Sequence, residues 1–370
     1  MGKPLEGVRV LDAASFIAGP LAAAMLGDLG ADVVKLELGA GDPLRRVGGV
    51  LGDDASASFA FANRGKRGIR LDPAAPECAA TVAGLAAAAD IVVHNQRAAR
   101  AKRLGLTGGG GIVVEITAFG NSGPYAERPA LDPIVQAMAG IAALTGEPDG
   151  EPRKVAAPVV DVATAATAAF AALAALREHE RTGEPARVTV SLFEVGLTLN
   201  ASNFAMRSAR GEPLERLGNA SHALIADQFA AADGLVWLAV WETRQWRRLC
   251  ELLGLGDLAT NERFATNADR VANQEELRPR LEQAIAGWLA EELRAALSSA
   301  GIPAAITLGL EAVVADPHVR AIGAMRTEPR LEGPDLTLPA GPLRLGGERP
   351  AAGRPAPRLG EHTDEILAEL

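Results

Sequence analysis

The sequence has few of the features that mark secreted or zinc-binding proteins. Only two cysteines, Cys78 and Cys250, occur in 370 residues, far apart and outside any Cys-x-x-Cys motif. A disulfide framework or a zinc knuckle is therefore not expected, and the composition suits a reducing compartment. The first residues lack the apolar core of a signal peptide, and the long apolar runs are alanine-rich and interrupted by charge or glycine. These features predict a cytoplasmic protein.

The chain also lacks an excess of positive charge. Its 37 Lys and Arg residues are outnumbered by 46 Asp and Glu residues, which gives a formal net charge of -9. Such a surface disfavours nonspecific binding to nucleic acids or to anionic membranes. An anionic small molecule would need a local basic pocket. The length allows two domains, or one large α/β domain with an insertion.

Common nucleotide and hydrolase motifs are absent as well. The sequence contains no Gly-x-x-x-x-Gly-Lys-[Ser/Thr], no Gly-x-Gly-x-x-Gly after the first predicted strand, no Gly-x-Ser-x-Gly and no His-Glu-x-x-His. Gly108–Gly111 precedes a strand rather than a helix, so it favours a tight connection over a phosphate-binding loop. The five histidines are scattered, and no metal site is predicted. Carboxylates therefore remain as candidate nucleophiles.

What the sequence does contain is a regular alternation of short apolar strands and single helices. Strands are predicted at 8–13, 32–37, 68–72, 90–94, 112–117 and 187–192, and helices at 20–29, 76–88, 132–143, 161–178 and 192–209. Strands separated by single helices form a parallel, doubly wound sheet of the α/β class. From 235 to 306 the pattern indicates a smaller α+β unit with charged helices. A strand within 335–345 and a closing helix are predicted near the C-terminus.

A single carboxylate, Asp161, lies in the apolar run Val155–Phe170, at the start of an alanine-rich helix. Aspartate there is a favoured N-cap, whose oxygen accepts hydrogen bonds from the first free N–H groups, worth about 1 kcal/mol. A carboxylate held ionised at a helix N-terminus and shielded from water is also a nucleophile for an activated acyl group. From this stretch alone capping is the commoner role, and both roles stay open. Asp132, followed by Pro133, is predicted to cap its own helix.

Basic residues gather in two segments, 63–67 and 97–103. On a helix, Arg100 and Arg103 share a face and Arg97 lies one turn earlier. Three guanidinium groups could therefore converge on a phosphate-rich ligand. A solvated helix face is the equally open alternative.

Taken together, several motifs resemble one enzyme family. They are Pro4–Asp12, Ala18-Gly-Pro20, Leu26–Lys35, Asn63-Arg-Gly-Lys-Arg67, Phe119–Tyr125, Leu144–Gly150 and Leu359–Glu365. On these residues the sequence is similar to the family III CoA-transferases, the CaiB/BaiF family. The resemblance implies a Rossmann-like large domain from both chain ends (1–205 and 326–370), a linker (206–225) and an inserted small α+β domain (226–325). It also implies an intertwined homodimer.

The activity that this resemblance implies is the transfer of CoA from a donor acyl-CoA to an acceptor carboxylic acid. In such relatives the residue matching Asp161 forms an acyl-aspartyl anhydride and then an aspartyl-CoA thioester. Asp132 matches a carboxylate near the reacting centre. The positions implied for CoA are Asn95 and Arg103, with Leu71, Ile17 and Ala18 lining the site and Arg97 added from the basic segment. Acyl-CoA and a carboxylic acid would be the partners, and no tightly bound cofactor, nucleic acid or membrane is expected.

Departures from the family pattern bear on which member this is. Leu131 stands where the related α-methylacyl-CoA racemases carry a histidine base, which argues against proton exchange at the α-carbon. Ile17 replaces a glutamine of formyl-CoA:oxalate transferases, and Leu38 and Gln96 replace a basic and an aromatic residue often used for CoA. A family helix before Gly108–Gly111 is predicted to be missing. The alternatives are an acyl-CoA racemase or isomerase, and a noncatalytic acyl-CoA-binding homologue.

Overall fold

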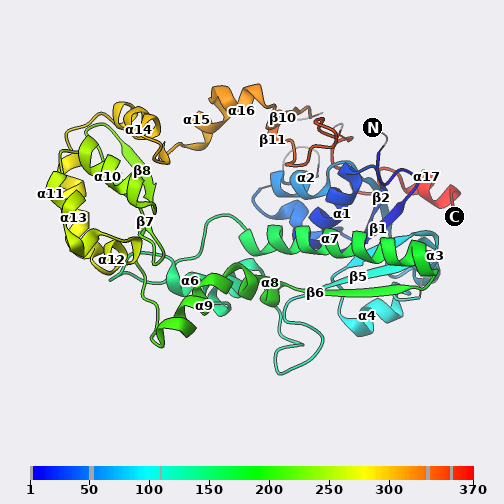
Figure 1. The fold of residues 1–370 in the computed structure, drawn as a ribbon. Helices are drawn as coiled ribbons and strands as arrows, with labels where there is room; N and C mark the ends of the chain where they lie inside the picture. Colours follow the sequence, from blue (N-terminus) through cyan, green and yellow to red (C-terminus); the bar gives the residue numbers. More distant parts are fainter. Residues whose placement is uncertain (1–2, 50–53, 109–110, 331–333, 351–352) are drawn as a thin grey trace. The chain divides into compact units, whose positions relative to one another are not determined.

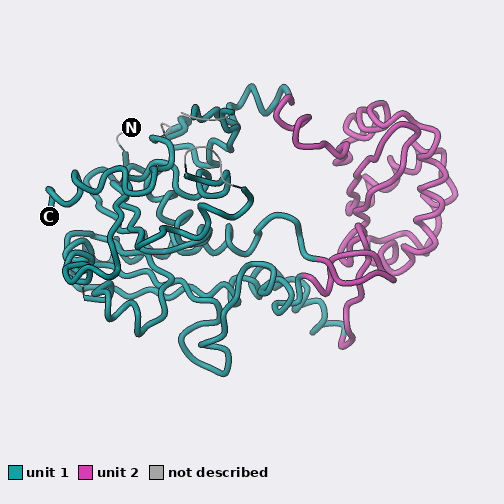
Figure 2. The backbone as a smooth tube through the Cα atoms, turned by 180° about the vertical axis from the view of Figure 1, so that it is seen from behind, with its two compact units in different colours: residues 1–141, 154–210, 317–370 teal, residues 142–153, 211–316 magenta. Residues whose placement is uncertain are grey.

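Figure 1 shows the computed structural model of the chain, which describes all residues except 1–2, 50–53, 109–110, 331–333 and 351–352. The chain divides into two compact units, which are coloured separately in Figure 2. Unit 1 contains residues 1–141, 154–210 and 317–370, and unit 2 contains residues 142–153 and 211–316. Unit 2 thus includes residues 142–153, which no feature of the sequence had separated from the large domain.

Unit 1 is built on a parallel sheet that has six strands in the described residues, in the order β3-β2-β1-β4-β5-β6. The strands are β1 (Arg9–Ala13), β2 (Asp32–Leu38), β3 (Arg67–Leu71), β4 (Ile91–His94), β5 (Ile112–Thr117) and β6 (Ala186–Ser191). Each neighbouring pair is parallel, which confirms the predicted α/β sheet. The strand order reverses between β1 and β4. Ligands of such sheets bind beside this point, at the carboxyl ends of the strands.

Helices cover both faces of the sheet. The helices of unit 1 include α1 (Ala18–Asp28), α2 (Ala57–Asn63), α3 (Cys78–Ala88), α4 (Ala98–Arg103), α5 (Asp132–Met138), α7 (Val159–Thr182), α8 (Leu192–Leu199), α9 (Ala201–Arg210), α16 (Pro317–Ala321) and α17 (Thr363–Ala368). Val10 and Val93 pack with α1 and α7, whereas their neighbours Leu11 and Val92 pack with α3, α4 and α17. The alternation of side chains along each strand therefore creates two apolar layers.

The long helix α7 is strongly apolar. Its length and its mean hydropathy of 1.9 over an 18-residue window would allow it to cross a membrane. In the structure it packs along α1 and against β5 and β6, with Ala165, Ala168 and Ala172 buried. Small side chains allow this close helix packing. One face of α7 thus belongs to the core of unit 1.

The segment 63–67, one of the two basic segments, is turned into the fold. Lys66 Nζ donates hydrogen bonds to Asp12 Oδ2 at 2.7 Å and to Asn63 Oδ1 at 2.8 Å. Lys35 Nζ donates to Asp42 Oδ2 at 2.9 Å and lies 3.5 Å from Asp12 Oδ2. Burial lowers the pKa of Lys66 to about 8, against the opposing effect of Asp12. The cations of this segment therefore pair with carboxylates of unit 1: Lys66 pairs with Asp12, Arg64 with Asp28, and Arg67 with Asp32, Glu365 and Glu369.

The same buried charges fix the loop between β1 and α1. Ala14 N donates to Asp12 Oδ1 at 3.0 Å, Lys35 Nζ donates to Ala14 O at 2.5 Å, and Phe16 N donates to Asp42 Oδ1 at 3.1 Å. Phe16 has a φ of 67°, a left-handed conformation that a bulky residue adopts only where its surroundings enforce it. The ion pairs thus hold a strained loop at the carboxyl end of β1.

We expect Asp12→Ala to lower the free energy of unfolding by about 3 to 5 kcal/mol, because it leaves Lys35 and Lys66 buried without their shared carboxylate. Urea titration followed by circular dichroism would measure the loss. Glu178→Ala, which removes an exposed ion pair with Arg181 on α7, is the control and should change stability little. Equal losses in the two variants would contradict the structural role of Asp12.

Unit 2 is a small α+β unit with an antiparallel sheet, β7-β8-β9. Its elements include β7 (Ile225–Ala230), β8 (Leu235–Val240), α10 (Thr243–Leu252), α11 (Gly256–Thr260), α12 (Asn267–Ala272), α13 (Gln274–Ile285), α14 (Ala290–Ser299), β9 (Ala304–Ile306) and α15 (Leu310–Ala315). Trp246, Phe264 and Leu249 lie in its core. A short sheet of β10 (Met325–Glu328) and β11 (Leu336–Pro339) belongs to the C-terminal part of unit 1.

Candidate active site

A cavity of about 490 Å³ lies in unit 1 at the carboxyl ends of β1, β4 and β5. Its wall includes Ser15 and Phe16 after β1, residues 95–98 after β4, and part of the loop before α5. Asp161, from the first turn of α7, lines the same cavity. A second cavity of about 390 Å³ shares Ser15, Phe16 and two residues after β4 with the first. The two cavities are therefore adjacent, beside the point where the strand order reverses.

The structure places Asp161 inside α7 rather than at its N-cap. The helix begins at Val159, and the N-cap residue Pro158 makes no side-chain capping hydrogen bond. Asp161 N–H is itself one of the free groups at the helix end. The predicted capping role of Asp161 is therefore wrong, because the helix starts two residues before it.

The cap of α7 comes from Asp132, in another helix. Asp132 Oδ2 accepts hydrogen bonds from Val160 N at 2.8 Å and from Asp161 N at 3.1 Å. Asp132 is the first residue of α5, where Leu131 takes the N-cap position, so the prediction that Asp132 caps its own helix is also wrong. A carboxylate from α5 can serve α7 because the two helices pack together.

Gln136 fixes the orientation of Asp132. Gln136 Nε2 donates to Asp132 Oδ1 at 2.5 Å, and Gln136 Oε1 accepts from Val155 N at 2.8 Å. Both side chains are buried, and Asp132 is only 5 % exposed. Both carboxylate oxygens of Asp132 are thus engaged, and Asp132 lines neither of the two cavities. Asp132 therefore holds the first turn of α7 in place.

The charge of Asp132 bears on Asp161 directly. Burial is the main cause that raises the pKa of Asp161 to about 7, and repulsion from Asp132 adds to it. No hydrogen bond within the described part of the chain stabilises the charged form of Asp161. The helix N–H groups expected to keep Asp161 ionised are used by Asp132 instead. Above pH 7 Asp161 is thus a poorly solvated carboxylate with a basic oxygen, which favours nucleophilic attack.

Two of the three arginines predicted to converge do reach the cavities. Arg97, at the N-cap of α4, lines the cavity that contains Asp161, and Arg100 lines the adjacent one. Arg103, the last residue of α4, lines neither. Arg97 and Arg100 are exposed, and neither forms an ion pair among the side chains that the structure describes. Both are available to an anionic ligand.

The other predicted CoA residues have different surroundings. Ala18 and Asn95 line the cavity with Asp161. Asn95 Oδ1 accepts from Ser15 N at 3.0 Å and its Nδ2 donates to Ser15 O at 2.9 Å, so this side chain joins the loops after β1 and β4. Ile17 and Leu71 pack against the two apolar layers of unit 1 and line neither cavity.

The predicted loss of a helix falls partly outside the described residues. Gly109 and Gly110 are not described, whereas the described residues between α4 and β5 contain no helix.

Phe16, which no motif of the sequence had indicated, lines both cavities. The position of Phe16, directly after the first strand of a parallel sheet, is the feature of the sequence that could have indicated it.

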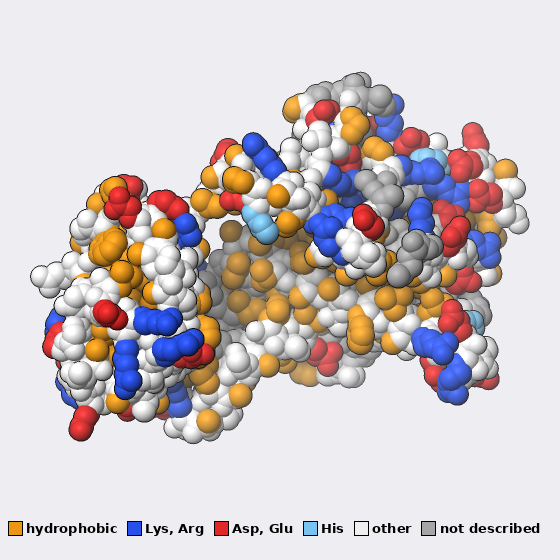
Figure 3. All heavy atoms as spheres, turned by 45° about the horizontal axis from the view of Figure 1, so that its top comes forward, with side chains coloured by type: hydrophobic (Ala, Val, Ile, Leu, Met, Phe, Trp, Pro, Cys, Tyr) orange, Lys and Arg blue, Asp and Glu red, His pale blue; other side chains and the backbone are white. Residues whose placement is uncertain are grey.

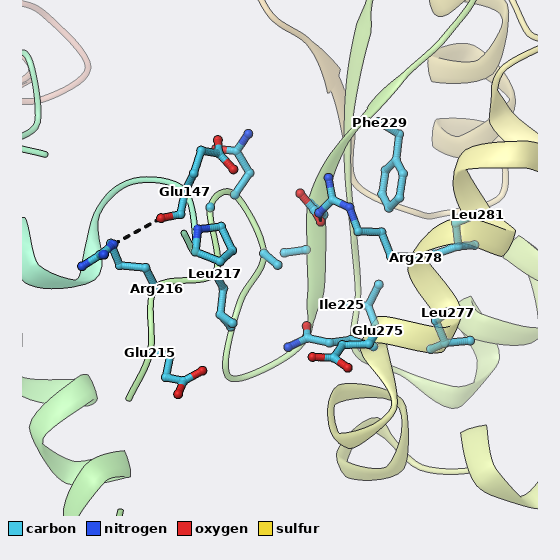
Figure 4. Close-up of a pocket in the computed structure, with 17 residues that line it drawn as sticks. Glu147, Glu215, Arg216, Leu217, Ile225, Phe229, Glu275, Leu277, Arg278 and Leu281 are labelled. Carbon is cyan, nitrogen blue, oxygen red and sulfur yellow. Dashed lines mark hydrogen bonds and ion pairs between the residues drawn. The ribbon is translucent and has the colours of Figure 1, made fainter. Parts of the chain in front are cut away.

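Unit 2 contains a separate cavity of about 410 Å³, shown in Figure 4. Arg216 donates from its guanidinium to the carbonyl oxygens of Ala143, Glu147 and Gly150, and Arg278 pairs with Asp227 and Glu282. The two arginines of this cavity thus hold the surrounding backbone and helices together.

Cys78 in unit 1 and Cys250 in unit 2 are buried free thiols. The described residues contain no cluster able to hold a metal ion.

Comparisons with known proteins show the family of this chain. The family model for CoA-transferase family III matches residues 5–363. This chain belongs to CoA-transferase family III. Succinate–glutarate CoA-transferase of Agrobacterium fabrum (strain C58) is 37 % identical, over 99 % of this chain and 96 % of that protein. Acetyl-CoA:oxalate CoA-transferase of Acetobacter aceti is 32 % identical, over 99 % and 96 % respectively.

Solved structures show the same relationship in three dimensions. A crystal structure of a CaiB/BaiF family protein from Brucella suis superposes with a TM-score of 0.86, at 34 % identity and with 100 % of both chains covered. The likeness therefore extends over both units of this CoA-transferase. Together with the curated relatives, it identifies the chain as an enzyme that uses CoA thioesters as substrates.

Proposed function

We propose that this CoA-transferase moves CoA from a donor acyl-CoA to an acceptor carboxylic acid through covalent intermediates on Asp161. One observation carries the proposal: Asp161 is a largely buried carboxylate without a stabilising partner, and it lines the cavity at the carboxyl ends of the parallel strands. Its ionised form is less hydrated than a carboxylate in water. The fixed cap at Asp132 holds the first turn of α7, and with it Asp161, in place.

In the proposed first half-reaction, an Asp161 oxygen attacks the thioester carbonyl and the C–S bond breaks. An acyl-aspartyl anhydride forms, and CoA leaves as the thiolate. The thiolate then attacks the aspartyl carbonyl of the anhydride, which releases the donor acid as a carboxylate and leaves an aspartyl-CoA thioester. Each step exchanges one activated acyl bond for another, so no ATP is consumed.

The second half-reaction reverses this order with the acceptor. The acceptor carboxylate attacks the aspartyl thioester carbonyl, which gives a new anhydride and frees the thiolate. The thiolate attacks the acceptor acyl carbonyl, releases acceptor acyl-CoA and regenerates the Asp161 carboxylate. Exclusion of water matters throughout, because both intermediates are open to hydrolysis.

The names of the relatives support a class of acceptor. Succinate, glutarate and oxalate, which appear in those names, are all dicarboxylic acids. We propose a short dicarboxylic acid as a substrate of this chain. The racemase alternative gains no support, because Leu131 lines the cavity where that reaction needs a base and the Asp132 carboxylate is engaged by α7 and Gln136.

Trapping with hydroxylamine tests the covalent mechanism. The enzyme is incubated with succinyl-CoA and then with hydroxylamine, and its peptides are analysed by mass spectrometry. A hydroxamate at Asp161 is the expected product, since anhydrides and thioesters both react with this nucleophile. Asp161→Asn is the control and should give no adduct. Absence of an adduct on the wild-type enzyme under turnover conditions would exclude the proposed intermediates.

Arg97→Gln and Arg100→Gln are each expected to raise the KM for acyl-CoA by about 3- to 10-fold, because each removes a cation available to the CoA phosphates. The effect should shrink at high ionic strength, since exposed charges are screened. Steady-state kinetics at two salt concentrations would measure it. Arg103→Gln is the matched control on the same helix and should change KM little. An equal effect of Arg103→Gln would instead favour its place in the CoA site.

We also propose that two copies form the intertwined homodimer of the family. Large apolar side chains are exposed on this chain, as the orange surface in Figure 3 illustrates; Phe170 on α7 is 72 % exposed and Leu310 on α15 is 81 % exposed. Helices α9, α15 and α16 contain no buried residue. Such surfaces are typical of interfaces.

Light scattering coupled to size-exclusion chromatography tests this assembly. The expected mass is twice the chain mass of 38.2 kDa. Because interlocked chains separate only by unfolding, the dimer should persist on dilution to nanomolar concentration. Phe170→Asp is expected to lower the yield of dimer, while Thr182→Asp, at the far end of α7 and on another face of the helix, serves as the control. A monomer of 38.2 kDa at micromolar concentration would contradict the proposal.

A further inference from the structure

The cavity that contains Asp161 is also lined by Arg128, which takes no part in the proposed covalent steps. Arg128 lies in the loop between β5 and α5. The other charged side chains that line this cavity are Arg97, Glu115, Glu127 and Asp161. Glu115 accepts a hydrogen bond from Asn121 Nδ2 at 2.7 Å. Within the described residues, the Arg128 guanidinium forms no ion pair and donates no hydrogen bond.

Arg128 is held by the face of its guanidinium instead. Its central carbon lies 4.0 Å from the centre of the Tyr125 ring. Tyr125 packs edge-to-face on Phe119, with ring centres 5.7 Å apart, and Phe119 contacts Phe193 of α8 at 5.6 Å. Phe119 is buried, so this chain of aromatic rings anchors the loop to unit 1. Stacking leaves the in-plane N–H donors of a guanidinium free to bind a ligand.

A free guanidinium in the same cavity as a nucleophilic carboxylate suits one class of substrate. Its planar fork binds a carboxylate through two parallel hydrogen bonds. The carboxyl group that reacts must reach Asp161, so Arg128 is left for a second carboxylate on the same acid. Arg97 is placed differently, since it begins the helix whose Arg100 faces the adjacent cavity.

We infer that Arg128 binds the distal carboxylate of a dicarboxylic acid and thereby selects diacids over monocarboxylic acids at Asp161. The inference rests on the proposed covalent function of Asp161 and adds the residue that determines acid specificity. Arg128 contacts the end of the substrate away from the reacting atoms. It therefore contributes to binding in both half-reactions whenever the acyl group carries a second carboxylate.

Internal competition between two acids of equal chain length tests this role. Glutarate and pentanoate differ in that the distal carboxylate of the first is a methyl group in the second. Both acids compete for the same enzyme–CoA thioester formed from succinyl-CoA, so the product ratio gives the ratio of their kcat/KM values whatever the donor step costs. We expect Arg128→Gln to lower the preference for glutarate by about 10- to 100-fold. Arg128→Lys should retain part of it.

The outcomes separate this inference from the proposed function. Arg97→Gln is the control, expected to raise the KM for the CoA thioester and to leave the acid ratio unchanged. An unchanged ratio in Arg128→Gln, with a hydroxamate still trapped at Asp161, would overturn the role of Arg128 alone. Absence of the hydroxamate on the wild-type enzyme would overturn the covalent function instead. Circular dichroism and thermal melting establish that each variant is folded before the ratios are compared.

Discussion

Asp161→Asn is expected to lower kcat by about a thousandfold or more and at the same time to stabilise the folded protein. The amide of asparagine cannot form the anhydride or the thioester, so the covalent route is lost. The stability effect follows from the pKa of Asp161, which rises from 3.8 to about 7 on folding. A buried carboxylate with a raised pKa costs stability wherever it is ionised in the folded protein.

The stability cost of Asp161 depends on pH through these two pKa values. Between pH 3.8 and about 7, unfolded chains have released the proton that the folded protein still holds. The contribution of Asp161 therefore becomes less favourable as pH rises through this window, and the cost is complete above it. At pH 8 the cost is up to about 4 kcal/mol, and Asp161→Asn should recover about 2 to 4 kcal/mol.

Two measurements check this pair of effects. Steady-state assays give kcat, and guanidinium titrations at pH 5 and pH 8 give the free energy of unfolding. The stabilisation should be larger at pH 8 than at pH 5, because only the wild-type side chain ionises. Retention of more than a tenth of the activity would argue against a nucleophilic Asp161. A loss of stability at pH 8 would argue against its raised pKa.

The second large effect is expected from Asp132→Asn. The variant removes the negative charge that helps to raise the pKa of Asp161, so the acid limb of the pH–rate profile should move below pH 7. It also disturbs hydrogen bonding. The new amide nitrogen would face Gln136 Nε2, and two donors cannot pair. We expect a loss of about 10- to 100-fold in kcat and of about 1 to 3 kcal/mol in stability.

A double variant separates the two roles of Asp132. In Asp132→Asn/Gln136→Glu, the new carboxylate can accept from the asparagine amide and from Val155 N, so the two short hydrogen bonds of Gln136 have counterparts and only the long one to Val155 O, at 3.5 Å, is lost. The negative charge then lies on residue 136 instead of residue 132. Stability should recover while the pH–rate profile stays shifted, which thermal melts and kcat/KM between pH 5 and pH 9 would show. Failure to recover stability would contradict the matched hydrogen-bond arrangement.

Much of the large sheet could be predicted because its signals are local. Each of the six predicted strands lies within a residue or two of an observed one, for instance Asp32–Leu38 against 32–37. Short runs of Val and Ile between helices mark buried parallel strands directly. The strand Ile225–Ala230 was missed, because Asp227 and Gln228 interrupt its apolar pattern. Its pairing with Leu235–Val240 decides its structure, and pairing is not a local property.

The basic residues show where local reasoning ends. The residues around Lys66 are compatible with a surface cation, yet the ammonium group of Lys66 is buried against Asp12, which is 54 positions away. Arg103 shares a helix with Arg100, but of the two only Arg100 lines the cavity next to that of Asp161. The sequence alone does not reveal whether a charged side chain faces the interior, a cavity or the solvent. That depends on which strands the flanking residues pair with.

The sequence by itself determined the α/β class, the family and the identity of Asp161 as the candidate nucleophile, because strand periodicity and motif order are properties of the chain. The tertiary structure decided how Asp161 is held. Only the packing of α5 against α7 brings Asp132 to the N–H groups of Val160 and Asp161, from 28 and 29 positions away. A local rule assigns the cap to the nearest aspartate. The free N–H groups are bound instead by the carboxylate that the fold places against them, and this leaves Asp161 without their stabilisation, as the proposed attack on a thioester requires.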